Sequence, residues 1–242
     1  ACAASGPGRL LEPAAIAARL ARLLAPRLLA GRKAVVTAGP TYEAIDPVRG
    51  LTNRSSGLQG YAIARAAWEA GAEVTLVSGP TALPVPEGVR AVPVVSAREM
   101  HAAAMDACRG ADLFVGVAAV ADWRPAEASE LKIKKEDGAP AWPAMAENPD
   151  ILADVARAFP GLVAVGFAAE THGVAGYARA KLERKGAAMI VANRAQDALG
   201  SPDNAVTLIT RGGEAALPPM NKLEVARAVV ARASQLIADR EA

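Results

Sequence analysis

The sequence predicts an α/β protein with a Rossmann-like, mostly parallel β-sheet, helices on both faces, and a C-terminal β-hairpin plus helix. Short apolar runs of strand length alternate with segments of helical period along most of the chain. Hydrophobic residues make up 52% of the 242 residues but aromatic residues only 4%. The core is therefore mainly aliphatic, as in a parallel sheet covered by helices. A chain of this length can bury such a core within one domain.

The first predicted element is a helix over Pro13–Ala25. Its proline stands just inside the helix start, where a missing N–H costs nothing, and its apolar residues recur at helical spacing. We expect residues 1–32 to be a linker and residues 33–242 to be the main domain.

The elements of the main domain follow from the alternating pattern. Strands are predicted at Ala34–Ala38, Glu73–Ser78, Ala91–Val95, Asp112–Val117, Leu162–Phe167 and Met189–Asn193. Helices are predicted at Tyr61–Ala70, Ser96–Cys108, Asn148–Ala158 and Ala175–Lys185. The run Asn204–Thr210 and the GGE and AALPP segments after it predict a hairpin, and an amphipathic pattern then predicts a closing helix.

Two helix starts carry capping signals. Ser96 and Glu99 fit a capping box. Asn148 is predicted to be an N-cap, with Pro149 at the first helical position and Asp150 in the first turn.

Composition argues against several classes of protein. A formal net charge of +2, spread along the chain, does not indicate a nucleic-acid-binding face. No run of about eighteen apolar residues predicts a membrane span, and the opening residues lack a signal-peptide pattern. Cys2 and Cys108 have no metal-site spacing and favour a reducing, cytoplasmic setting. His101 and His172 are isolated, which argues against a zinc site or a histidine-based triad.

The segment NRSSGLQG (residues 53–60) ends a long loop between a predicted strand and a helix. Gly57 and Gly60 would let backbone N–H groups approach a phosphate, with the Ser55 and Ser56 hydroxyls nearby. The alternative is a turn that only caps the helix, and the octet alone does not decide between them. Neither GxGxxG nor the P-loop motif is present.

Other polar segments follow the predicted strands, where open α/β sheets bind ligands. Lys132, Lys134 and Lys135 form either a charged sheet edge or a lid over a polyphosphate. Asp122 suits a hydroxyl or a metal ion, or marks a strand end that turns away. Lys181 and Lys185 share one helix face, which is by default a solvated stripe.

Together and in this order, several segments resemble phosphopantothenoylcysteine synthetases, in particular the synthetase half of bacterial bifunctional phosphopantothenoylcysteine decarboxylase/synthetases. The segments are VTAGPTYEAIDPVRGLTNRSSGLQG, AAVADWRPAEASELKIKK, ENPDIL, VGFAAET, YARAKLERKGA, IVAN and DNAVTLIT. The resemblance runs from about Lys33 to the C-terminal helix. The opening ACAASGPGRLLEP is similar to the end of the decarboxylase half, in which Cys2 would match the flap cysteine that donates a proton.

The resemblance implies a CTP-dependent ligase of coenzyme A biosynthesis that joins 4'-phosphopantothenate to L-cysteine through an acyl-cytidylate. It implies Mg²⁺ with CTP, a homodimer, and a decarboxylase domain in the full-length protein, where FMN would belong.

The resemblance also implies roles for individual residues. Arg49, Asn53 and Lys132 would be catalytic, and Asp122 would contact the metal ion. The acyl substrate would lie against Arg49, Asn53, Ser55, Ser56 and Gly57. The nucleotide would lie against Gly116, Val117, Ala118, Ala119, Asp122, Lys132, Asn148, Pro149, Asp150, Ile151, Phe167, Lys181 and Lys185. Tyr42, Leu58 and Glu147 depart from the family pattern; at Leu58 the departure loses a positive charge beside the phosphate.

Two alternative functions predict different sequence features. A nicotinamide-dependent oxidoreductase would carry a GxGxxG turn and an acidic residue after its second strand, where this chain has Ser78-Gly79-Pro80. A non-catalytic nucleotide-sensing module would keep the nucleotide loops without requiring both Asn53 and Lys132.

Overall fold

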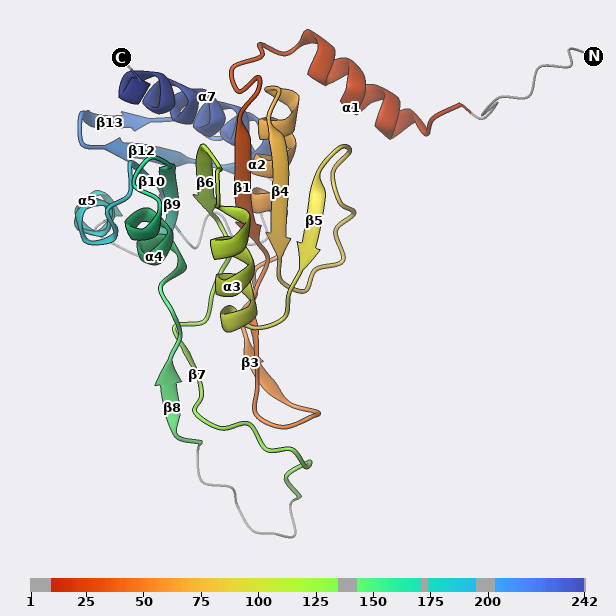
Figure 1. The fold of residues 1–242 in the computed structure, drawn as a ribbon, viewed down its shortest axis with the longest axis vertical. Helices are drawn as coiled ribbons and strands as arrows, with labels where there is room; N and C mark the ends of the chain where they lie inside the picture. The colour runs from red at the N-terminus through yellow and green to blue at the C-terminus, as the bar shows by residue number, and fades with distance from the viewer. Residues whose placement is uncertain (1–9, 135–142, 171–173, 195–202, 242) are drawn as a thin grey trace, which may run out of the picture.

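The computed structural model describes residues 10–134, 143–170, 174–194 and 203–241 (Figure 1). The predictions for Cys2, Lys135 and His172 lie outside these ranges. An eight-stranded sheet has the order β13-β12-β10-β9-β6-β1-β4-β5. Neighbouring strands from β10 to β5 pair in parallel, and β12 and β13 are antiparallel. The predicted fold class is confirmed.

The strands of the sheet match the predicted runs closely. They are β1 (Lys33–Ala38), β4 (Glu73–Ser78), β5 (Arg90–Pro93), β6 (Leu113–Gly116), β9 (Val163–Glu170), β10 (Met189–Arg194), β12 (Val206–Thr210) and β13 (Gly213–Ala216). The last two form the predicted hairpin. A separate small pairing joins β11 (Asp203–Asn204) to β14 (Met220–Asn221).

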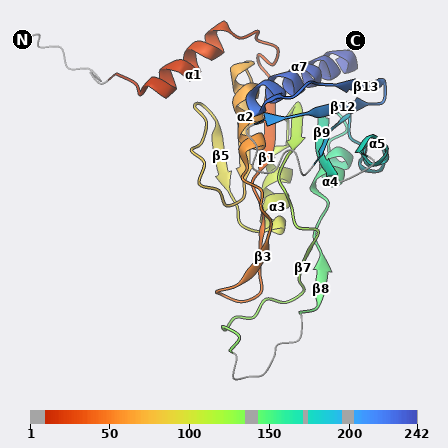
Figure 2. The ribbon, with the colours of Figure 1, turned by 180° about the vertical axis from the view of Figure 1, so that it is seen from behind.

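Helices cover both faces of the sheet (Figures 1 and 2). Successive strand residues point to opposite faces, so Val36 packs with α2 (Leu58–Glu69) and α7 (Lys222–Glu241). Its neighbour Val35 packs with α3 (Ala97–Ala107) and α4 (Ile151–Ala158). Helix α5 (Val174–Lys185) packs against Ile190 and Ile209, next to α4. The aliphatic core predicted from composition therefore has two layers around the sheet.

One of the two predicted helix caps is correct. The Ser96 hydroxyl accepts a hydrogen bond from Glu99 N at 3.2 Å, as in a capping box. The prediction that Asn148 caps α4 is wrong, because Asp150 is the N-cap and accepts from Ala153 N at 3.1 Å. The Asn148 side chain instead donates a hydrogen bond to the Ala121 carbonyl.

Two short antiparallel ribbons extend from the sheet on the same side (Figure 1). One pairs β2 (Tyr42–Ala44) with β3 (Gly50–Thr52), and the other pairs β7 (Trp123–Pro125) with β8 (Met145–Glu147). We call these ribbons and the described parts of their connecting turns the arm. In the first ribbon, a Cβ on Gly50 would lie 2.4 Å from Cζ of Tyr42. A residue without a side chain is therefore needed beneath this ring.

Helix α1 (Pro13–Leu24) is the helix predicted at the start of the chain, and it lies outside the main core (Figure 1). None of its residues is buried, and Leu20, Leu23 and Leu24 are exposed. The Arg22 guanidinium, 4.6 Å from the centre of the Trp68 ring, holds it to α2. Within the described ranges, no helix is both long enough and apolar enough to span a membrane.

Cys108, at the C-terminal end of α3, is expected to be chemically inert in the folded protein. Its side chain is buried, and this burial raises the pKa of the thiol to about 12. The thiolate that reacts with alkylating agents is therefore scarce at neutral or mildly alkaline pH. In a Cys2→Ser variant, mass spectrometry should find no alkylation by iodoacetamide before denaturation and one adduct afterwards. Rapid alkylation of the folded variant would contradict this expectation.

Candidate functional site

A cavity of about 380 Å³ lies beyond the carboxyl ends of β1, β6 and β9. This is the edge at which open α/β sheets bind their ligands. Most residues predicted to bind a nucleotide line it: Gly116, Ala118, Asp122, Asn148, Pro149, Asp150, Ile151, Phe167, Lys181 and Lys185. Val117, Ala119 and Lys132 are not among the lining residues. The structure thus brings together segments that are far apart in the sequence.

The cavity is also lined by residues that the sequence did not single out as ligand contacts. Thr37 and Phe114 lie on β1 and β6, and Trp123 and Glu147 begin and end the second ribbon of the arm. Thr37 and Phe114 lie within apolar runs that indicate only buried strands. Trp123 follows Asp122 directly in the sequence, and this adjacency could have indicated that Trp123 lies at the cavity.

Lys181 and Lys185 form the cationic side of the cavity. Lys181 Nζ donates a hydrogen bond to the Phe167 carbonyl at 2.8 Å. Lys185 forms an ion pair with Asp150, whose other carboxylate oxygen caps α4. Their spacing suggested a solvated stripe, but both side chains are partly buried and turn toward the cavity. The pair is therefore part of the cavity wall.

Hydrogen bonds tie the two polar walls of the cavity together. Asn148 Nδ2 donates to the Ala121 carbonyl, and Asn148 N donates to the Asp122 carbonyl, both at 2.8 Å. The Arg124 guanidinium donates to the Glu147 carbonyl and, at 3.3 Å, to Asn148 Oδ1. These bonds fix the backbone that carries Asp122.

Asp122 and Glu147 both line the cavity, and Asp122 is one carboxylate there that is available to a ligand. Nothing in the described ranges hydrogen-bonds its side chain, whereas both oxygens of Asp150 are occupied. The described residues include no cluster of three or more acidic, histidine or cysteine side chains suited to a metal. A cation beside Asp122 would therefore take its other ligands from phosphate groups and water.

The NRSSGLQG loop lies next to the cavity without lining it. Asn53 Nδ2 donates to the Ala119 carbonyl at 2.6 Å, and Asn53 Oδ1 accepts from Ser55 N at 3.0 Å. Asn53 is therefore bonded to the residue that follows Ala118 of the cavity wall. The hydroxyls of Ser55 and Ser56 accept from the backbone N–H groups two residues later.

The two glycines of this loop have different roles. Gly57 is buried, with a φ of 78° that favours glycine, and it is the N-cap residue of α2. Helix α2 begins at Leu58, earlier than predicted, so Gly60 lies inside its first turn. A Cβ on Gly60 would be 2.5 Å from Cβ of Ala38. The close approach of α2 to β1, rather than anion binding, explains Gly60.

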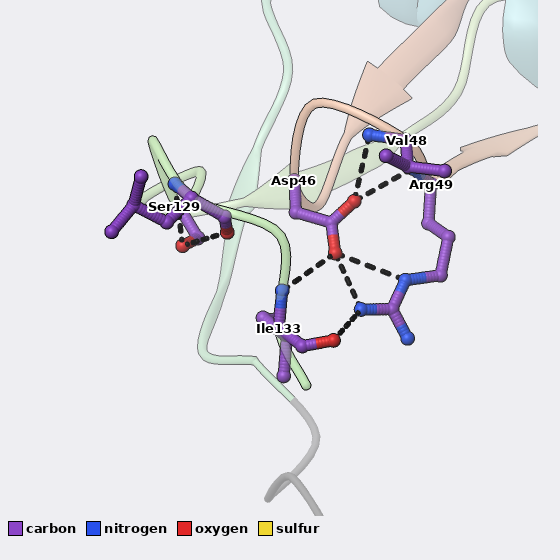
Figure 3. Close-up of polar contacts among 6 residues, drawn as sticks. Asp46, Val48, Arg49, Ser129 and Ile133 are labelled. Carbon is purple, nitrogen blue, oxygen red and sulfur yellow. Dashed lines mark hydrogen bonds and ion pairs between the residues drawn. The ribbon is translucent and has the colours of Figure 1, made fainter. Parts of the chain in front are cut away.

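Arg49 and Lys132 lie on the arm rather than in the cavity. Arg49 donates from Nη2 to Asp46 at 2.5 Å and to the Ile133 carbonyl at 2.7 Å (Figure 3). Lys132 and Lys134 are exposed, and Ile133 between them is partly buried. Residues 131–134 form no strand.

A family model described as "DNA/pantothenate metabolism flavoprotein C-terminal domain" matches residues 29–237. The chain belongs to this family. It is 47% identical over 235 residues to the coenzyme A biosynthesis bifunctional protein CoaBC of Vibrio cholerae, a match that covers 95% of this chain and 59% of that relative. The CoaBC protein of Bacillus subtilis is 41% identical over 233 residues, covering 93% of this chain and 57% of the relative.

A solved structure supports the same family. The crystal structure of the C-terminal domain of a CoaBC protein superimposes with a TM-score of 0.76 and 40% sequence identity. The match covers 88% of this chain and 99% of that structure. The family resemblance read from the sequence is therefore confirmed. The chain spans less than two thirds of the length of the CoaBC relatives.

Proposed function

We propose that this chain is a CTP-dependent ligase that joins 4'-phosphopantothenate to L-cysteine in coenzyme A biosynthesis. The observation that carries the proposal is the cavity of a CoaBC-related chain, with two lysines on one side and an available carboxylate at Asp122. The substrate carboxylate attacks the α-phosphorus of CTP, and pyrophosphate leaves. The cysteine amine then attacks the acyl carbonyl, loses a proton, and displaces CMP as the amide forms.

The cavity residues suit this chemistry, which requires positioning and charge stabilisation more than a nucleophilic side chain. Lys181 and Lys185 would hold the triphosphate, and Phe167 with the backbone of Gly116 to Ala118 would receive the base. The apolar and backbone surfaces can bind a flat ring, while the cations oppose the phosphate charge.

Mg²⁺ is the cation that this donor set fits. A nucleotide-bound Mg²⁺ commonly uses one or two protein carboxylates together with phosphate oxygens and water. Asp122 supplies one such carboxylate at the edge of the cavity. Bound there, Mg²⁺ would neutralise phosphate charge, and the Asn148 bonds to Ala121 and Asp122 would keep the carboxylate in place.

The acyl substrate is proposed to lie between the cavity and the arm, against Arg49, Asn53, Ser55, Ser56 and Gly57. Arg49 binds Asp46 and Ile133 through Nε and Nη2, which leaves Nη1 for a substrate anion. Asn53 bonds to Ala119 through one amide hydrogen and has a second to donate. Both residues can therefore contact substrate while keeping their contacts within the chain.

Turnover is expected with CTP and to be weak with ATP. A small pocket with backbone groups near Ala118 and the Asn148–Ile151 turn can fit a pyrimidine edge and exclude a purine. Pyrophosphate release should be measured with each nucleotide, phosphopantothenate and cysteine, and again with each substrate omitted. Equal turnover with both nucleotides would refute the preference. Absence of release with either would favour a sensing module, and hydride transfer would favour an oxidoreductase.

We also propose that the protein is a homodimer joined through the arm. The arm exposes apolar side chains, with Val48 61%, Trp123 50% and Leu131 79% exposed. Isolated two-stranded ribbons are marginally stable in water, so burial against a second copy would stabilise them. Sedimentation should show a dimer at micromolar concentration, and Leu131→Glu should shift it toward monomer. A parent protein that sediments only as a monomer would contradict this proposal.

The segment before the main domain is proposed to connect it to a decarboxylase domain. Helix α1 has an exposed leucine face and lies before residue 29, where the family match begins. In that arrangement, residues 1–32 would be the linker, Cys2 would belong to the decarboxylase flap, and FMN would bind only to the other domain. The proposed setting of the whole protein is the cytoplasm, where its nucleotide substrate is made.

A further inference from the structure

Asp46 is a buried carboxylate in the turn of the first ribbon of the arm, and both of its oxygens are occupied (Figure 3). Oδ1 accepts from Val48 N and Arg49 N, each at 2.8 Å. Oδ2 accepts from Arg49 Nε at 2.9 Å and from Arg49 Nη2 at 2.5 Å. The Arg49 guanidinium, assisted by the backbone N–H groups, holds the pKa of Asp46 well below its usual range.

The same pair of side chains also binds a distant segment of the chain. Asp46 Oδ2 accepts from Ile133 N at 3.2 Å, and Arg49 Nη2 donates to Ile133 O at 2.7 Å. Ser129 N donates to the Ile45 carbonyl at 2.9 Å. Both backbone polar groups of Ile133 are thus fixed to the first ribbon (Figure 3). Lys132 precedes Ile133 directly.

A turn alone would not require this arrangement. Oδ1 already satisfies the two N–H groups of the turn, as an Asx turn does. Oδ2 accepts from Ile133 N as well as from the Arg49 guanidinium, and Arg49 Nη2 also donates to the Ile133 carbonyl. These additional bonds hold the Ile133 peptide groups rather than the turn. Holding these groups removes backbone freedom on one side of Lys132, whose own side chain is exposed. The Asp46–Arg49 pair therefore limits the directions in which the Lys132 ammonium can point.

We propose that Asp46 is a positioning residue that acts through Lys132. It holds the Ile133 backbone and so limits the directions from which the Lys132 ammonium can reach the phosphates of the nucleotide. This inference rests on the function proposed above for Lys132 in CTP turnover.

The variant that tests the proposal is Asp46→Asn. Asparagine keeps an oxygen for the Val48 and Arg49 N–H groups, but its amide nitrogen cannot accept from Ile133 N. Asp112→Asn is the matched control. Asp112 also accepts hydrogen bonds from an arginine side chain (Arg32) and from a backbone N–H (Lys33), but it lies at the amino ends of the strands, away from the cavity. If Asp46→Asn melts below the assay temperature, Asp46→Ser keeps a turn-forming oxygen and takes its place.

Two readouts are expected to change in Asp46→Asn and not in Asp112→Asn. Amide exchange at Ile133 should accelerate by about tenfold or more, because a local hydrogen bond is lost. The kcat should fall on the order of tenfold, and the KM for CTP should stay within about threefold, because a group that acts in the transition state is misplaced. Unchanged exchange, or faster exchange with an unchanged kcat, would overturn the proposal.

A double variant separates positioning from general damage. If Asp46 acts through Lys132, Asp46→Asn combined with Lys132→Gln should be no slower than Lys132→Gln alone. Multiplied rate losses would overturn the proposal. A parent protein that releases no pyrophosphate would instead refute the proposed function, and Ile133 exchange would still decide whether Asp46 holds this segment.

Discussion

Replacing Lys132 with glutamine is expected to lower kcat on the order of a hundredfold, because the ammonium would stabilise charge that moves onto the leaving pyrophosphate. The KM for CTP should change much less, since Lys181 and Lys185 would still hold the ground-state triphosphate. Lys132 is exposed on the arm, so its replacement should change the free energy of unfolding by only a few tenths of a kcal/mol. Pyrophosphate release beside a thermal melt measures both effects.

Lys134→Gln is the matched control for this experiment, because Lys134 is also exposed and lies on the same segment. It should lose less activity if the Ile133 contacts direct Lys132 in particular toward the nucleotide. An unchanged rate in Lys132→Gln, with the fold intact, would show that the lysine run is only a charged edge of the arm.

Replacing Asn53 with aspartate is expected to stall the second half-reaction. In the parent, the amide donates to the Ala119 carbonyl at 2.6 Å. A carboxylate cannot donate, so two oxygens would face each other, and its charge would also repel the phosphate of an acyl-cytidylate. Ala118, which lines the cavity, would be displaced with its neighbour. We expect amide formation to fall on the order of a hundredfold, as for other losses of precise positioning.

Rapid-quench measurements of pyrophosphate, CMP and amide product can locate the step that Asn53→Asp slows. Pyrophosphate should appear first while the acyl-cytidylate persists. Thr52→Val is the control, because it removes a neighbouring hydrogen bond from the Thr52 hydroxyl to the Thr41 carbonyl without adding charge. If Asn53→Asp forms the amide as fast as the parent, the role assigned to Asn53 is wrong.

Sequence reasoning was sufficient for the strands of the sheet because their signal is local. The runs at β1 and β4 are mostly apolar after a charged first residue, without a regular polar alternation, and this pattern indicates burial on both faces. The ribbon β2/β3 was not predicted, because its strands are three residues long and depend on cross-strand contacts such as Tyr42 over Gly50. Periodicity cannot reveal strands this short.

The candidate site was predictable to the extent that strand ends meet at one edge of a sheet. Asp122, Phe167 and Lys181 come from separate segments, and the structure places all three around one cavity. The sequence could not show which polar groups would bind each other. Asparagine is a common N-cap residue, but the side chain of Asn148 is hydrogen-bonded to Ala121 and Arg124, which are distant in the sequence.

The ion pair of Asp150 with Lys185 gives the cavity a resident counter-ion. A partly buried ammonium without a partner would be costly to desolvate, and this carboxylate compensates the charge before any ligand arrives. A phosphate group that approaches Lys185 therefore has to compete with the Asp150 carboxylate for the ammonium. That carboxylate stays close by, because its other oxygen caps α4. Asp150 can thus pair with Lys185 again when the phosphate departs, so the ammonium has an anionic partner both before and after a ligand is bound.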